Sequence, residues 1–158
     1  MYKRLSFSLM FISTLILIVV STGYAATSLK LNPNLDYSSD SNDGPLITGD
    51  NMNHGVIHPG KPAHIIFYHR ECYNSKRQAR RTVDLYDKYS GKVDFIVVDL
   101  DSAISKEQNE LKDRFYKNYI PHVTIIDGKG NVVHDGSGEV GTDALSRILD
   151  KALTVNPN

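Results

Sequence analysis

The chain of 158 residues has a single cysteine, Cys72, and no tryptophan. One cysteine cannot form a disulfide within the chain, so an internal disulfide is excluded as a source of stability. The length is enough for one domain with a hydrophobic core and additional segments. Cys72 is therefore a buried small residue, a residue without a role, or a thiol that partner molecules can reach.

An excess of charge of either sign is also missing, because 18 basic residues balance 18 acidic ones. Without Lys3 and Arg4, 18 − 2 = 16 basic residues face 18 acidic ones, a net charge near −2. Nucleic-acid binding needs a basic stripe, so the sequence predicts no nucleic-acid partner. It predicts no cofactor either: the glycine-rich turn at 127–130 joins two strands, whereas a phosphate-binding loop leads into a helix.

Charged residues are absent from 5–26, directly after a basic start. This start, the apolar run at 9–20 and the small residues around 23–25 predict a cleavable signal peptide over residues 1–25. The alternative is an uncleaved membrane anchor, because the 22 residues of 5–26 can cross ~30 Å of hydrocarbon. Cleavage is favoured, since the densely apolar part is short. Under both interpretations the remaining chain is extracytoplasmic, either periplasmic or secreted.

Residues 26–59 are poor in apolar side chains and rich in turn-forming ones, above all over 36–45. Such a segment has too little apolar surface to offset the entropy lost on ordering the chain. We therefore expect a flexible linker over 26–59. Within it, 46–47 and 56–57 are candidates for short edge strands.

Residues 60–155 alternate between strand and helix patterns. The predicted elements are, in order, strand 63–68, helix 72–89, strand 93–100, helix 106–119, strands 122–126 and 131–134, and helix 142–153. Strands joined through helices lie parallel, whereas the tight turn makes the last two strands antiparallel. The prediction is an α/β domain, a mixed central sheet of order β-α-β-α-β-β-α flanked by helices.

In order and spacing these elements resemble thioredoxin-like proteins from about residue 61 to 153. The segments that carry the resemblance are IIFYHREC, VDFIVVDLD, YIPHVTIID, DGKGNVV and DGSGEVGTDAL. In that family the cysteine that opens the first long helix is the nucleophile, and a cis-proline before the third core strand lies opposite it. Cys72 and Pro121 match these two positions, so the resemblance implies a thioredoxin-like fold and a cis bond between Ile120 and Pro121.

The family motif Cys-x-x-Cys is incomplete here, because residues 72–75 are CYNS. Ser75 replaces the resolving thiol, and Ile66 replaces the buried aspartate that serves this thiol. Glu71 stands where the family usually has tryptophan. A cycle in which the domain alternates between dithiol and disulfide is therefore excluded.

A single thiol at a helix N-terminus still has useful chemistry. The unpaired N–H groups and the positive end of the helix dipole favour the thiolate, which attacks disulfides to form mixed disulfides. Release then requires the client's own second thiol, glutathione or another protein. The resemblance implies that Cys72 attacks and that Pro121 presents the client backbone. Ser75 lies one turn along the predicted helix, so we expect its hydroxyl to donate to the sulfur. Contacts with the substrate are expected from Tyr73, Ile120 and His122.

Two alternatives remain open. The first is a redox-inactive module that binds proteins, for example by strand addition at the proline loop. The second, a minor one, is a Cu(I) or Zn site made by Cys72 with His69 and His122. The basic residues of the predicted helix after Cys72 are expected to form a solvated face. They are Lys76, Arg77, Arg80 and Arg81.

Overall fold

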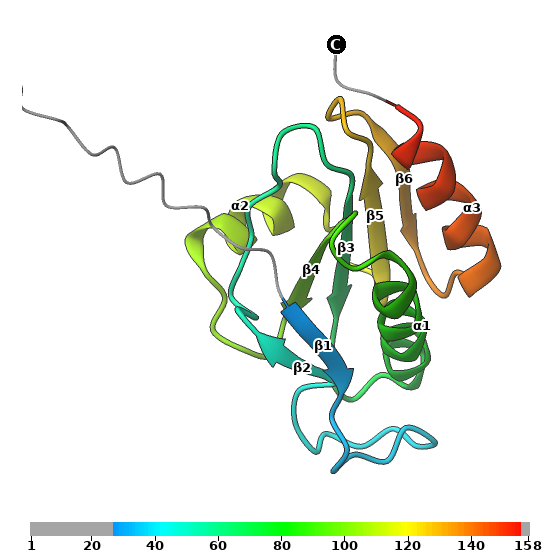
Figure 1. The fold of residues 1–158 in the computed structure, drawn as a ribbon. Coiled ribbons are helices and arrows are strands. Elements are labelled where there is room, and N and C mark those ends of the chain that lie inside the picture. Colours follow the sequence, from blue (N-terminus) through cyan, green and yellow to red (C-terminus); the bar gives the residue numbers. More distant parts are fainter. Residues whose placement is uncertain (1–26, 156–158) are drawn as a thin grey trace, which may run out of the picture.

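The computed structural model describes residues 27–155, and a four-stranded mixed sheet forms its centre (Figure 1). The strands are β3 (Ala63–Tyr68), β4 (Asp94–Asp99), β5 (His122–Ile126) and β6 (Val132–Ser137), and the sheet order is β4-β3-β5-β6. β3 and β4 are parallel, whereas β5 is antiparallel to both β3 and β6. The predicted mixed sheet and the predicted order of elements are confirmed.

Three helices cover the two faces of this sheet. They are α1 (Tyr73–Tyr89), α2 (Lys106–Phe115) and α3 (Thr142–Leu153). Leu85 of α1 and Leu145 of α3 belong to one hydrophobic cluster, and Leu111 of α2 belongs to the other. Side chains of successive strand residues point to opposite faces, so Ile66 enters the first cluster and Phe67 the second.

The helix predicted over 106–119 is shorter in the structure. It begins at a capping box, in which the Ser105 side chain and the Gln108 side chain each accept from the other residue's backbone N–H. It ends at Phe115 with Tyr116 as its C-cap, and Asn118 has a left-handed backbone (φ 63°). The chain between α2 and β5 is thus a connecting loop, which carries the exposed residues before Pro121.

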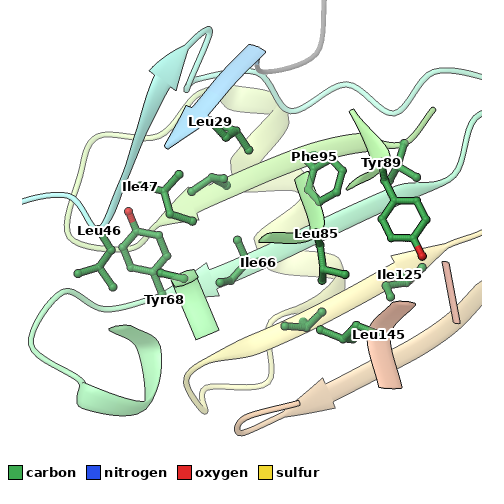
Figure 2. Packing of buried hydrophobic residues seen from close by; sticks show 14 of the residues in the cluster. Leu29, Leu46, Ile47, Ile66, Tyr68, Leu85, Tyr89, Phe95, Ile125 and Leu145 are labelled. Atoms are coloured by element: carbon green, nitrogen blue, oxygen red, sulfur yellow. The ribbon is translucent and has the colours of Figure 1, made fainter. Parts of the chain in front are cut away.

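Residues 27–59 are not a flexible linker, so this prediction is wrong for the part of the segment that the structure describes. β1 (Thr27–Leu31) and β2 (Ile47–Asp50) form an antiparallel pair. Leu46 and Ile47 are buried in the first hydrophobic cluster beside Tyr68 of β3 (Figure 2). Few apolar residues are present, but four are buried and most of the others pack against a hydrophobic cluster. This burial offsets the entropy that is lost when the segment becomes ordered.

The two candidate edge strands in this segment differ in outcome. Residue 47 begins β2, as expected, whereas 56–57 form no strand. Ile57 instead packs against the second hydrophobic cluster, and Val56 is exposed. The signal peptide or anchor predicted over 1–25 lies outside the described residues. Between residues 27 and 155, none of the helices combines the length and the apolar character that crossing a membrane requires.

Candidate functional site

Cys72 is the N-cap residue of α1, with extended backbone angles (φ −78°, ψ 118°) and a partly exposed side chain. Its carbonyl oxygen accepts the first helical hydrogen bond, from Lys76 N–H at 3.0 Å. Its thiol makes no capping hydrogen bond to the helix. The predicted position of the cysteine at the start of the first long helix is confirmed.

Two aspartates, one at the end of β4 and one just after it, fix the loop that leads from β3 to Cys72. Arg70 Nε donates to Asp99 Oδ2 at 2.9 Å, and Arg70 N–H donates to Asp101 Oδ2 at 2.7 Å. His69 Nδ1 lies 2.8 Å from Asp101 Oδ1. Burial works to raise the pKa of Asp101, but the hydrogen bonds from Arg70 and His69 outweigh it and lower this pKa. The carboxylate pair therefore holds the backbone directly before the thiol.

Pro121 lies at the same end of the sheet as Cys72. Phe67, near the end of β3, pairs with His122 at the start of the antiparallel strand β5, so the residue before β5 meets the loop after β3. The Ile120-Pro121 peptide bond is cis, as the family resemblance implied. The Pro121 carbonyl accepts from Gly138 N–H at 2.7 Å, which ties this loop to the end of β6.

Ser75 is fully buried one turn after Cys72. No group in the described part of the chain forms a hydrogen bond with its Oγ, so the predicted donation to the Cys72 sulfur is absent. Tyr73 is partly buried, and the Arg77 guanidinium lies 4.7 Å from the centre of its ring. Ile120 is partly exposed. Its neighbour Tyr119, which the sequence did not single out, is 72% exposed at the proline loop.

His122 does not offer its side chain to a substrate, so this prediction is wrong for the conformation observed. The ring is 1% exposed and faces the α2 side of the sheet, 5.9 Å from the ring of Phe67. Nδ1 lies 2.8 Å from Ser137 Oγ, and Nε2 lies 2.8 Å from Asp135 Oδ1. Both ring nitrogens are thus engaged. Across residues 27–155, no three histidine, cysteine or acidic side chains are grouped to hold a metal ion, which leaves the metal alternative without support.

The loop between β1 and β2 packs on the start of α1, at the end of the sheet that carries Cys72 (Figure 1). We call residues 36–43 of this loop the strap. The N–H of Tyr73, the first residue of α1, donates to Asp40 Oδ1 of the strap at 2.6 Å. Lys76 Nζ donates to Asp36 O at 2.6 Å and to Ser41 Oγ at 2.8 Å.

The basic residues of α1 form a solvated face only in part: Arg77 and Arg80 are exposed, but all four side chains have partners elsewhere in the chain. Lys76 is completely buried under the strap. Arg77 and Arg81 form ion pairs with Glu139, which precedes α3, and the Arg80 guanidinium lies 5.2 Å from the centre of the Tyr37 ring. These partners are 35 or more residues away in the sequence, so composition and periodicity gave no signal of them.

Comparisons with known proteins identify the fold. No protein-family model and no curated protein sequence matches the chain. Among solved structures, thioredoxin-2 of a malaria parasite, described as a component of the parasite's protein secretion machinery, has a TM-score of 0.51 and 18% identity. The match covers 61% of this chain and 88% of that chain.

Two further structures are similar to a lesser degree. The germline-specific thioredoxin Deadhead of Drosophila melanogaster has 21% identity and a TM-score of 0.46, over 58% of this chain and 81% of that chain. A malarial protein has 18% identity and a TM-score of 0.49, over 59% and 98%. At these identities the similarity shows the fold alone. The chain has a thioredoxin-like fold, with a mixed four-stranded sheet and three helices.

Proposed function

We propose that this protein carries out thiol–disulfide exchange on client proteins outside the cytoplasm, with Cys72 as a monothiol nucleophile. The observation that carries the proposal is the placement of a partly exposed thiol at the N-cap of α1, at the end of the sheet that also carries cis-Pro121. Export rests on the signal sequence predicted over residues 1–25.

The exchange follows from the chemistry of one thiolate. Cys72 Sγ attacks one sulfur of a client disulfide, so a new S–S bond forms as the client's S–S bond breaks. The displaced client thiolate takes a proton from water. The client's own second thiol, or glutathione, then attacks the mixed disulfide and restores the free Cys72 thiol. Residue 75 supplies no second thiol, so this sequence suits isomerisation of wrong disulfides or reversal of S-glutathionylation.

The surrounding residues take supporting roles in this proposal. Pro121 and Ile120 present the client backbone, and Tyr73 and the exposed Tyr119 contact the bound segment. The Ser75 hydroxyl has no partner within residues 27–155, so it can donate to the sulfur once a client is bound. The neighbouring loop is held by Asp99 and Asp101, which keeps Cys72 in place during attack.

The test is recovery of activity by ribonuclease with scrambled disulfides, in a glutathione buffer. The wild-type protein is expected to accelerate the recovery of ribonuclease activity. With Cys72→Ser, ribonuclease is expected to recover no faster than in the glutathione buffer alone. Asp87→Asn, an exposed position near the other end of α1, serves as the control that should keep the wild-type rate. Equal recovery with wild type and Cys72→Ser would contradict the proposal.

A second candidate function is a redox-inactive module that binds peptides. The exposed Tyr119 side chain beside the proline loop favours it, because large exposed aromatic residues are common at binding surfaces. The two candidates predict different results. A redox-inactive module still binds a peptide after Cys72→Ser, and neither the wild-type protein nor this variant forms a mixed disulfide with a client.

A further inference from the structure

The strap makes hydrogen bonds to the residues on both sides of Cys72. Before the thiol, Asn42 Nδ2 donates to Glu71 Oε1 at 3.2 Å. After it, Tyr73 N–H donates to Asp40 Oδ1 at 2.6 Å. Cys72 therefore lies between two points at which the strap is attached.

Lys76 of α1 anchors the strap through hydrogen bonds. Its side chain is fully buried, and its ammonium group donates to Asp36 O and Ser41 Oγ, which lie in different parts of the strap. Hydrogen bonds to a charged donor are among the stronger ones in proteins. The anchor also lies on α1, one turn after Cys72, so the strap and the thiol are positioned by the same helix turn.

Asp40 competes with the thiolate for the end of the helix. The first N–H groups of a helix have no partner within the helix, and they stabilise a negative charge placed there. Asp40 already accepts one of these hydrogen bonds, from Tyr73, the residue that follows Cys72. A carboxylate already placed at the helix end repels a second negative charge there, so Asp40 opposes the negatively charged sulfur that attack requires.

We propose that the strap is an autoinhibitory segment, which restrains Cys72 until it is displaced from α1. This inference rests on the proposed function, because a restraint matters only where the thiol reacts. Asp40 supplies the opposing charge, and Lys76 is the positioning residue that keeps this charge in place. Binding of a client segment over the start of α1 would displace the strap and release the thiol.

The test compares alkylation of Cys72 by iodoacetamide, which is neutral, and by iodoacetate, which is an anion. Asp40→Asn removes the charge, and Lys76→Met removes the anchor. Both are expected to react with iodoacetamide about tenfold faster than wild type, the effect of losing roughly one charge-assisted hydrogen bond. Asp87→Asn and Lys92→Met are the controls: each removes a charge of the same sign as its strap counterpart, at an exposed position on α1 or just after it. Both should react as wild type does.

The ratio of the iodoacetate rate to the iodoacetamide rate separates inhibition from a general loosening of the fold. A nearby carboxylate slows the anionic reagent selectively, so this ratio should rise in both strap variants and stay constant in both controls. If all variants and the wild type react rapidly and with one ratio, the strap does not restrain the thiol, and the proposed function stands. If none reacts, although the denatured chain does, both the restraint and the proposed exchange fail.

Discussion

Replacing Ser75 with cysteine is expected to shorten the lifetime of a glutathione adduct at Cys72 by about a hundredfold or more, because an intramolecular thiol acts at a very high effective concentration. Residues three apart lie on one face of a helix, so a thiol at position 75 is within reach of the sulfur at position 72. The new thiol would attack the adduct, release glutathione and leave a disulfide between the two positions.

The measurement is the decay of the adduct, followed by intact mass without added reductant. Thr82→Cys is a matched control, since Thr82 is also fully buried on α1 and its hydroxyl also lacks a partner in the described structure. It lies ten residues from Cys72, about 15 Å along the axis at ~1.5 Å per residue, too far to attack. An adduct that survives as long in Ser75→Cys as in Thr82→Cys would show that positions 72 and 75 do not face each other.

Acidification is expected to destabilise the protein through His64 of β3. Its ring is fully buried and lies 5.2 Å from the ring of Phe95, and no group among residues 27–155 bonds either ring nitrogen. Burial lowers the pKa of His64 from 6.5 to about 4, and the nearby His134 adds to this shift. Protonation of this ring therefore requires a charge to be placed inside the core.

The direction of the pH effect follows from proton binding. Below pH 6.5 the unfolded chain protonates this histidine, whereas the native state does not until about pH 4. Stability is therefore complete above the unfolded pKa and is lost as the pH falls toward about 4. The full loss is roughly 3 kcal/mol, from 1.36 kcal/mol per pKa unit.

Urea unfolding at pH 7 and pH 4.5 tests this effect. His64→Leu should lose less stability than wild type over this interval, by roughly 2–3 kcal/mol. Burial also lowers the pKa of His134, so part of the acid loss remains in the variant. His54→Leu, on the loop before β3, should keep the wild-type loss. Equal acid losses in all three proteins would show that His64 does not control acid stability.

The central domain was predictable because its elements are long and strongly patterned. The apolar runs before Cys72 and at 93–100 are bounded by glycine or charged residues, and each became a strand within two residues of its predicted limits. The last helix matches its prediction fully at Thr142–Leu153. Local sequence determines these elements, and the tertiary contacts agree with it.

The strap was not predictable for the opposite reason. Its aspartate and serine residues form local turns, for example Ser38 N–H to Asp36 Oδ1, which give a composition typical of disorder. What orders it is a buried lysine on α1, 35 residues beyond Ser41 in the chain. Lys76 itself was expected in water, because a lysine is rarely buried unless it is paired.

His122 was misplaced because β5 is buried on both faces. In a strand with one solvated face, alternation shows which side chains point outward, but all five residues of β5 are buried, so the pattern gives no direction. The register supplies the direction: His122 pairs with Phe67 and Ser137, and its ring lies with their side chains on the α2 side of the sheet.

The account depends most on whether Cys72 is nucleophilic in the folded protein. The direct measurement is incubation of wild type and Asp40→Asn with oxidised glutathione, with intact mass read over time and a denatured sample in parallel. We predict one adduct per chain at Cys72, reversible by added thiol and formed faster in Asp40→Asn than in wild type. An adduct on the denatured chain but on neither folded protein would contradict the claim.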